Sequence, residues 1–440
     1  MSAQEARAAA ERTARASYGR LLALLAASTG DLAHAEDALS AAFEQALISW
    51  PSDGVPANPE AWLLTVARNR QRDSWKSAYN RAFAPLDTTG ELGRDAMAAD
   101  VVEVEVDVDA IADKRLELLF VCTHPAIDPA VRTPLMLQTV LGFDAARIGA
   151  VFNVPATAMA QRLVRAKKRI KEARIPFVVP SRQDMPGRLS AVLEAIYGCY
   201  AIAWVGEFLA SGGVGDASDA GGVAAADDLR GEAHYLAMTL ARLLENEAEA
   251  WGLAALIAFS LARVPGRLEP AEPGRDRRFR PLEEQDTALW DAALIAEGDA
   301  CLRRAVAVAV PGRFQLEAAI QAVHCARARS GLTDWTALRT LYAALVAVAP
   351  SLGAQVALAS VIGRVENPEA GLTAMGAIAA GEPAGVRAAV ERFQPFHAAR
   401  AELLARAGRT AEASAEFTAA AFMTHEPAVR HYLVNRAETG

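Results

Sequence analysis

The segment PATAMAQRLVRAKKRIKEARIP, residues 155–176, carries the pattern that decides the fold of this chain. Its apolar positions recur every three or four residues, which predicts one buried face of an amphipathic helix. These positions are Met159, Leu163, Ala166 and Ile170. Seven basic residues share the segment with a single acid, Glu172. Because the whole chain has a formal net charge of -8, this cationic face is a local feature and favours a polyanionic partner.

A shorter helical pattern, DAARIGAVFN at 144–153, lies just upstream of the basic helix. The residues NVPA make a tight turn between the two helices. This is the helix-turn-helix arrangement, whose second helix enters the DNA major groove. Arginine pairs with guanine edges and glutamine with adenine, so Gln161, Arg162 and Arg165 are candidate base-reading residues. Lysines later in the helix, such as Lys168, would contact phosphates. The alternative is a solvated cationic helix face without a partner.

A second cluster of aromatic and basic residues occurs in AWLLTVARNRQRDSWKSAYNR at 61–81. Aromatic side chains stack on unpaired bases, while cations follow the phosphate backbone of a single strand. The pattern therefore predicts contact with melted DNA, although Trp62 taken alone is more typical of a core residue. Further along, residues 86–113 are strongly acidic. They indicate either a solvated spacer or an acidic strand that competes with nucleic acid for a basic groove.

Paired helices recur in the last third of the chain, near 319–349, 354–379 and 396–422. Their spacing is close to the roughly 34 residues of a tetratricopeptide repeat. The clearest copy is FHAARAELLARAGRTAEASAEFTAAA, in which Gly408 makes the turn between two apolar helix faces. The predicted faces are Ala399, Leu403 and Leu404 on the first helix and Ala413, Phe417 and Ala420 on the second. Stacked helix pairs of this kind form surfaces suited to a peptide or a neighbouring domain.

Composition narrows both the fold class and the function classes. The chain is rich in alanine and leucine and has only 6% aromatic residues, so we predict an all-α protein. The four cysteines lie far apart without a CxxC pair, which argues against a zinc site or a disulfide framework. No phosphate-binding loop, HExxH pair or GxSxG elbow occurs, so we expect no enzyme, no cofactor and no metal. The charged N-terminus and the short apolar runs predict a soluble cytoplasmic protein without a membrane partner.

Three motifs in order along the chain give it a family resemblance. They are AEDALSAAF at 35–43, AWLLTVARNRQRD at 61–73 and IGAVFNVPATAMAQRLVRAKKRI at 148–170. Together they resemble an extracytoplasmic-function sigma factor, a small bacterial transcription initiation factor. The long helical region that follows resembles the extension of a subgroup with a C-terminal tetratricopeptide-like domain, which is thought to regulate the factor.

The resemblance implies four domains and three functional surfaces. Sigma region 2 would occupy 1–85, an acidic linker 86–113, the region 4 helix-turn-helix 114–180, and the extension 181–440. Core polymerase would contact Asp37, Leu39 and Phe43. The -10 element would contact Trp62, Arg68, Asn69, Arg72, Asp73 and Lys76. The -35 element would contact Thr157, Gln161, Arg162, Arg165, Lys168 and Arg169.

The partners implied are core RNA polymerase and promoter DNA, with an intramolecular contact between the extension and the sigma modules. Two other function classes stay open at the level of sequence. One is a stand-alone helix-turn-helix regulator, which would need high affinity for duplex DNA without polymerase, usually as a dimer. The other is a repeat scaffold that needs no DNA.

Overall fold

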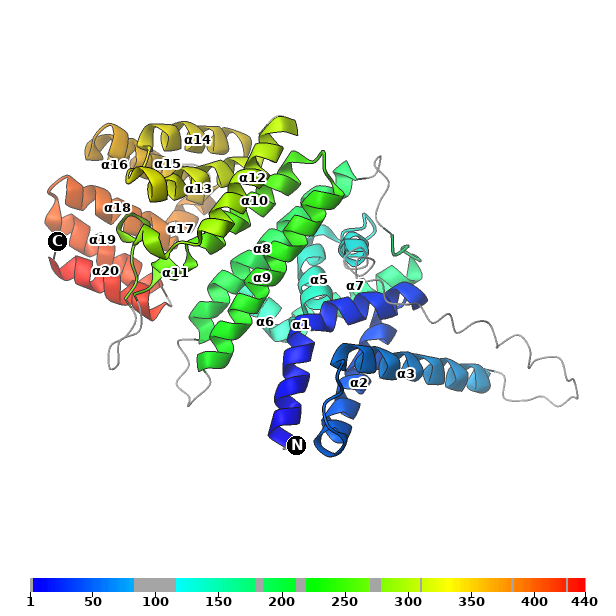
Figure 1. The fold of residues 1–440 in the computed structure, drawn as a ribbon. Coiled ribbons are helices and arrows are strands. Elements are labelled where there is room, and N and C mark those ends of the chain that lie inside the picture. Colours follow the sequence, from blue (N-terminus) through cyan, green and yellow to red (C-terminus); the bar gives the residue numbers. More distant parts are fainter. Residues whose placement is uncertain are drawn as a thin grey trace, which may run out of the picture. The chain divides into compact units, whose positions relative to one another are not determined.

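Helices form almost the whole of the described structure (Figure 1). The computed structural model describes residues 3–82, 116–152, 154–178, 185–210, 219–269, 278–308, 311–380, 384–424 and 426–439. Within these ranges the only β pairing is one isolated bridge between Leu268 and Phe279. The all-α prediction is therefore confirmed. The predicted acidic linker at 86–113 lies outside the described residues.

Two compact units follow one another along the chain, Met1–Gly198 and Cys199–Gly440. The first unit begins with three helices, α1 (Ala3–Thr29), α2 (Leu32–Asp53) and α3 (Pro59–Ala82). Capping residues determine where α2 and α3 begin. Asp31 caps α2 by accepting a hydrogen bond from the backbone N–H of His34, and Asn58 caps α3 by accepting one from that of Ala61.

Because proline breaks helices, Pro51 predicts from the sequence that the second helix ends there, which is two residues too early. Pro51 lies inside α2, which continues to Asp53 and ends at Gly54, where φ is 87°. A proline in the last turn removes one backbone donor but leaves its own φ helical. The glycine, with its positive φ, is what turns the chain away.

The core of these three helices is apolar and closely packed. It contains Leu21, Leu22 and Leu25 from α1, Leu39 and Trp50 from α2, and Leu63 and Ala67 from α3. At its edge the Trp50 and Trp62 rings meet edge to face, with centroids 5.6 Å apart. Burial of this many large side chains fixes the directions of the exposed faces of α2 and α3.

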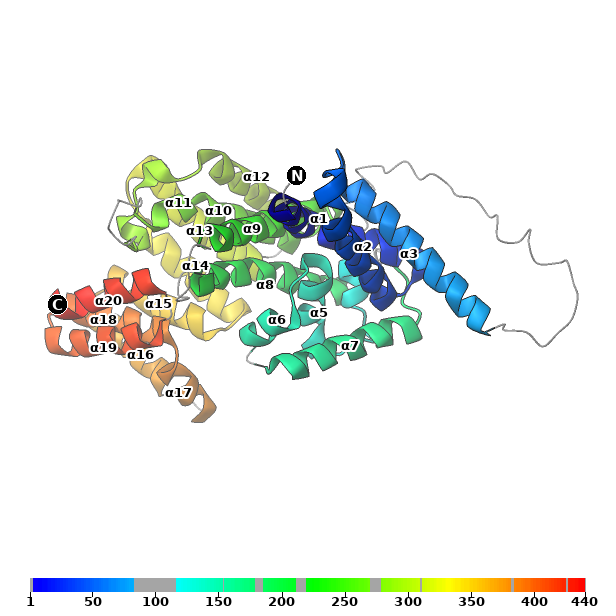
Figure 2. The same ribbon diagram turned by 90° about the horizontal axis from the view of Figure 1, so that it is seen from below.

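A second group of helices completes the first unit (Figure 2). Residues 116–122 are helical, and α5 (Pro129–Leu141), α6 (Ala145–Val151) and α7 (Ala156–Glu172) follow. The helices predicted within 144–153 and 155–176 thus both form. α8 (Pro186–Ala210) spans the division between the units. Its first half is buried at Leu189 and Val192, and the Arg188 guanidinium lies 5.7 Å from the centre of the Phe120 ring.

The second unit is built around one apolar helix, α10 (Ala248–Ala262), in which every residue except Glu249 and Leu261 is buried. It packs against α9 (Asp219–Leu243), α12 (Ala292–Val308) and α13 (Arg313–Ser330). Glu249 caps α13 from outside the helix, accepting from the backbone N–H groups of Phe314 at 2.9 Å and Gln315 at 3.0 Å. Short α11 (Val264–Arg267), η2 (Leu282–Glu284) and η3 (Thr287–Leu289) lie between α10 and α12 in the chain.

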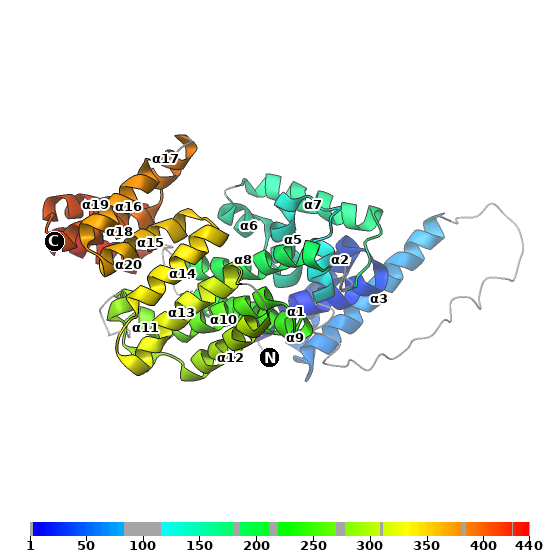
Figure 3. The ribbon, with the colours of Figure 1, turned by 90° about the horizontal axis from the view of Figure 1, so that it is seen from above.

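The remaining helices form successive pairs (Figure 3). They are α14 (Trp335–Val348), α15 (Leu352–Val365), α16 (Pro368–Ala379), α17 (Ala384–Glu391), α18 (Gln394–Arg406), α19 (Thr410–Met423) and α20 (Pro427–Thr439). The pairs α13–α14, α15–α16 and α18–α19 occupy the ranges predicted from the sequence. Gly408 makes the last of these turns with φ at 76°.

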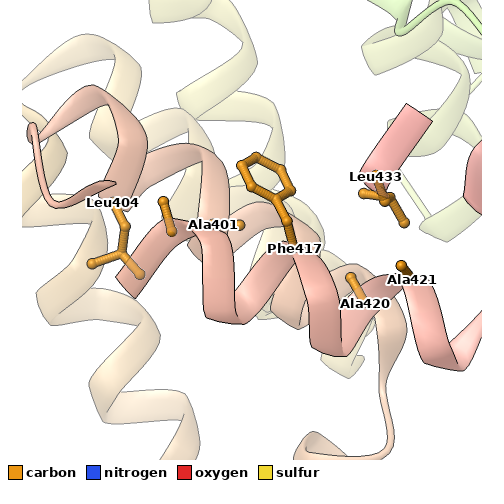
Figure 4. Packing of buried hydrophobic residues seen from close by; sticks show 7 residues of the cluster. Ala401, Leu404, Phe417, Ala420, Ala421 and Leu433 are labelled. Atoms are coloured by element: carbon orange, nitrogen blue, oxygen red, sulfur yellow. The ribbon is translucent and has the colours of Figure 1, made fainter. Parts of the chain in front are cut away.

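The predicted apolar faces of α18 are partly wrong. Leu404 and Ala401 pack with Ala413, Phe417, Ala420, Ala421 and Leu433 (Figure 4). Leu403 and Ala399 belong instead to a different cluster, with residues of α15 and α16. The reason is that α18 packs against α19 and α20 on one face and against α15 and α16 on another. The sequence pattern predicts only one buried face.

Candidate nucleic-acid interface

The basic helix α7 has one buried face and one exposed face. Met159, Leu163, Ala166 and Ile170 are buried, as the spacing predicted. The six residues expected to contact the -35 element are all exposed, namely Thr157, Gln161, Arg162, Arg165, Lys168 and Arg169. At 100° per residue, Thr157, Gln161 and Lys168 lie opposite the buried face and Arg165 lies beside them. These side chains therefore form a continuous cationic surface along α7.

A close turn sets the direction of α7 relative to α6. The backbone N–H of Val154 donates to the carbonyl oxygen of Gly149 at 2.8 Å. A Cβ at position 149 would lie 2.5 Å from the carbonyl oxygen of Val154. Only glycine fits here, so this residue holds the two helices at their crossing angle.

The exposed side chains of α7 are only lightly held. The Arg165 Nε donates to the Gln161 carbonyl oxygen at 3.3 Å, and the Lys168 ammonium lies 3.6 Å from the Glu172 carboxylate. Exposed contacts of this kind contribute a few tenths of a kcal/mol, about 0.3–0.5 kcal/mol for an i,i+4 pair. Phosphates or base edges would displace them at little cost.

Sequence reasoning missed Val164, which is 61% exposed in the middle of this surface. It lies three residues after Gln161 and four before Lys168, so the helical spacing already placed it between them. An apolar side chain here can contact the methyl group of thymine. The helical spacing alone identifies Val164 as a surface position, whereas a search for charged residues does not.

Two of the seven basic residues pair with carboxylates outside α7. Lys167 is only 9% exposed, and its ammonium lies 2.5 Å from the Glu36 carboxylate of α2. The Lys171 ammonium lies 2.7 Å from the Asp31 carboxylate, which also caps α2. Part of the positive charge that marks this segment therefore binds another helix of the same unit.

These two ion pairs differ in their electrostatics. Burial raises the pKa of Glu36 above its usual value, although the charge of Lys167 and the hydrogen bond from it act in the opposite direction. The pKa of Asp31 is lowered, because the hydrogen bond and charge of Lys171 and the backbone N–H of His34 outweigh the effect of burial. Desolvation of the first pair thus costs more than its attraction returns at Glu36.

The helix α3 carries the residues expected to contact the -10 element. Arg68, Asn69, Arg72 and Asp73 are exposed on it. Trp62 is half-buried against Trp50, so its packing role is observed and its contact with bases stays a prediction. The side chain of Lys76 lies outside the described residues.

The helix α2 carries the residues expected to contact core polymerase, and here one prediction is wrong. Asp37 is exposed and Phe43 is half-buried, but Leu39 is fully buried in the core and presents no surface to a partner. The exposed face of α2 continues instead through Ser40, Glu44, Leu47 and Ile48. Ile48 is 71% exposed, and its spacing from Glu44 could have identified it.

Other chemistries find little support in the described part of the chain. No group of three or more His, Cys, Asp or Glu side chains there could hold a metal ion. All four cysteines are buried. Burial raises the pKa of Cys122 to about 12 and those of Cys301 and Cys325 to about 11, so these thiols are not nucleophiles at neutral pH. Among the described helices, none combines the length and the hydropathy that crossing a bilayer requires.

Two parts of the chain match models of known protein families, and one of these parts lies in the first three helices. Residues 14–81 match the family model for sigma-70 region 2, and residues 188–306 match a family of unknown function (DUF6596). This match to region 2 supports a sigma-70 family factor with a role in transcription initiation.

The chain is similar to a curated protein whose name is "Uncharacterized protein R00370". It is a protein of Rhizobium meliloti (strain 1021) that is 33% identical over 385 residues, covering 87% of this chain and 84% of the relative. The two proteins belong to one family. No solved structure shows significant similarity to the chain.

Proposed function

We propose that this protein is an extracytoplasmic-function sigma factor that binds core RNA polymerase in the cytoplasm and directs it to promoters with defined -35 and -10 elements. The observation that carries the proposal is the exposed cationic face of α7 in a chain whose residues 14–81 match sigma-70 region 2. In this assignment α6 and α7 form a helix-turn-helix whose second helix enters the major groove. No enzymatic step and no cofactor is part of the function.

On α7 the proposed roles follow the position of each side chain along the helix. Gln161, Arg162 and Arg165 lie in the N-terminal part and read base edges, with Val164 contacting a thymine methyl group. Lys168 and Arg169 lie later and contact phosphates, which fixes the register of the helix on the duplex.

The exposed polar face of α3 contacts the displaced strand at the -10 element. Arg68 and Arg72 are one helical turn apart and follow the phosphates, while Asn69 and Asp73 lie beside them. Lys76 extends the same row in the sequence. Trp62 supports this helix through Trp50, and its half-buried ring stacks on an unpaired base.

Core polymerase binds the exposed face of α2. Asp37, Ser40, Glu44, Leu47 and Ile48 follow one another at helical spacing on this face. It combines two acids with two exposed aliphatic side chains, which suits a partner surface with an apolar centre and a basic edge. The half-buried Phe43 lies at its border.

Run-off transcription tests the proposed function. Purified core polymerase would be mixed with a promoter template in the presence and absence of the full-length protein. Transcripts that depend on the protein support the proposal. Tight binding to duplex DNA without any polymerase-dependent transcript would instead favour a stand-alone regulator, and no binding to DNA or polymerase would favour a repeat scaffold.

The second unit is proposed to regulate the sigma modules, as the extension of the tetratricopeptide-like subgroup is thought to do. Its helix pairs α13–α14, α15–α16 and α18–α19 support that assignment. A truncation tests it, and the structure suggests where to cut. Leu189, Val192 and Leu193 of α8 contribute buried side chains to the first unit, so a truncation after Ala210 keeps α8 whole. Unchanged transcription by the truncated protein in every condition tried would exclude the regulatory role.

A further inference from the structure

A cavity in the second unit plays no part in the proposed function. Its volume is about 590 Å³, and it lies among α16, α17 and α18 beside the start of α19. α16 packs on both α17 and α18, so the cavity is bounded by helices of one unit. Sites for small molecules typically have volumes of about 300–1,000 Å³. The cavity is therefore large enough for a small ligand.

The wall of the cavity includes part of the apolar core. Four lining side chains are buried, namely Met375 from α16, Val390 from α17, and Phe396 and Leu404 from α18. Met375, Val390 and Phe396 pack in one cluster, so the core holds this wall in place without a ligand. An apolar wall beside open space favours a ligand with an apolar body.

Gly376 of α16 leaves the opening of the cavity clear. It lines the cavity and is exposed, and a Cβ at this position would meet nothing within 4 Å outside its own turn of helix. Gly371 in the same helix is different, because its Cβ would lie 2.9 Å from the Cα of Gly363. Packing therefore favours glycine at 371 but not at 376, where glycine weakens the helix relative to alanine. The missing side chain at 376 leaves room for a ligand to enter.

Two arginines bring positive charge to the same cavity. Arg387 of α17 is exposed, lines the cavity, and forms no hydrogen bond or ion pair within the part of the chain that the structure describes. Arg400 of α18 is half-buried and donates from Nη1 to the Glu416 carboxylate at 2.6 Å. A guanidinium has five N–H donors, so a single carboxylate contact leaves donors for a second anion.

A hydrogen-bond network fixes the position of the Arg400 guanidinium. The second oxygen of the Glu416 carboxylate lies 2.7 Å from Nδ1 of His397. The Nε2 atom of His397 lies 3.2 Å from the backbone carbonyl oxygen of Glu391, at the end of α17. These contacts connect α17, α18 and α19 around the cavity. A donor that is already held in place loses less entropy when it binds a ligand.

The other charged residues of the lining limit the charge of the ligand. Arg409 is held by the Glu412 carboxylate at 2.7 Å and lies 3.7 Å from that of Glu369, so carboxylates of the protein balance its charge. Glu391 is exposed and places a negative charge in the lining. This charge disfavours a polyanion such as a polyphosphate, so a ligand with one carboxylate fits the lining better.

We propose that the cavity among α16, α17 and α18 binds a small amphipathic carboxylate. Its apolar body would lie against Met375, Val390 and Phe396, and its carboxylate would lie between Arg387 and Arg400. The planar guanidinium of arginine matches the geometry of a carboxylate and forms charge-assisted hydrogen bonds with it. The site belongs wholly to the second unit, so binding requires neither polymerase nor DNA and is independent of the proposed function.

Isothermal titration calorimetry of the full-length protein tests this proposal. The probes are octanoate and 2-naphthoate, two carboxylates whose apolar bodies differ in shape. At least one of them should bind saturably at one site per chain. Octanol lacks the carboxylate and acetate lacks the apolar body, so each should bind more weakly by about tenfold or more. No saturable binding of either carboxylate, or binding of octanol as tight as that of the better carboxylate, would overturn the proposal.

A variant that fills the opening locates the site. Gly376→Leu places a side chain in open space at the cavity and should weaken binding of the carboxylate by about tenfold or more. Leucine is a better helix former than glycine, so this variant keeps its fold. Gly231→Leu is the matched control, because Gly231 is also an exposed glycine within a helix, α9, with nothing within 4 Å of its Cβ position. It should leave the affinity unchanged.

Charge variants identify the residues that hold the carboxylate. Arg387→Ala and Arg400→Ala should each weaken its binding by about tenfold. Arg392→Ala is the matched control, because it removes the same charge just beyond the end of α17 and outside the lining of the cavity. Wild-type affinity in Gly376→Leu, or in both cavity arginine variants, would show that the carboxylate binds elsewhere and would overturn the proposal. Equal weakening in the controls would do the same.

Discussion

The basic side chains of α7 and those of the second unit differ in how far carboxylates of the protein neutralise their charge. On α7 most cations are exposed. Arg165 and Lys168 contact only groups of their own helix, whereas Lys167 and Lys171 pair with Glu36 and Asp31. In the second unit arginines are fixed by carboxylates, as in the pairs Arg267–Glu426, Arg400–Glu416 and Arg436–Glu402 at 2.6–2.9 Å. The comparison teaches that basic residues alone do not mark a DNA surface. A basic side chain is available to bind DNA only when no carboxylate from another helix of the same protein is already paired with it.

The largest expected effect is a loss of stability when the apolar core next to Arg436 in the second unit is disrupted. The ring of Phe417 is fully buried in the α18–α19–α20 cluster, and the Arg436 guanidinium lies 5.0 Å from its centre. Phe417→Ala should lower the free energy of unfolding by about 3–5 kcal/mol, through lost burial and the cavity left behind. Urea unfolding measures it, with Phe422→Ala as the control. Phe422 is 84% exposed, and a comparable loss there would contradict the packing described.

A second effect follows from a half-buried histidine, His324, near two arginines of the second unit. Burial, together with the nearby charges of Arg263 and Arg327, lowers the pKa of His324 to about 3. The unfolded chain binds a proton near pH 6.5, so this contribution is complete above that pH and is lost as the pH falls toward 3. At pH 4 the loss should be about 3 kcal/mol.

The variant His324→Phe isolates this effect, because it keeps an aromatic ring against Trp335 and removes the titrating group. The difference in unfolding free energy between wild type and variant should change between pH 6.5 and pH 4. A difference that is constant over this range would show that His324 is accessible to protons in the folded protein.

The smallest effect concerns a single phosphate contact on α7. Lys168→Ala should weaken binding to duplex DNA of any sequence and reduce the slope of log K against log salt by about 0.9. Fluorescence anisotropy over a salt series measures the slope. Arg400→Ala is the matched control, because its guanidinium is already paired with Glu416 and should leave the slope unchanged. Equal changes in both variants would remove the distinction between the two regions.

Sequence predicted those features that depend on neighbours in the chain. The turn at Gly408 and the buried stripe of α7 are both set by residues within four positions of each other, and both were found. The contrast between Lys167 and Lys168 could not be predicted, because the partner of Lys167 is Glu36, 131 positions away. Leu39 was misassigned for a related reason: a motif shows which helix contacts a partner, and only the packing shows which of its residues face outward.

The central claim is that α7 selects the promoter, and transcription from paired templates tests it most directly. The templates would differ only in the -35 element, and core polymerase would be supplied with wild-type protein or with Arg165→Ala. We predict that the wild type strongly prefers one template and that the variant loses about 1–3 kcal/mol of this preference, a factor of roughly 5–150, while still supporting initiation. An Arg165→Ala protein with undiminished preference between the templates would contradict the claim.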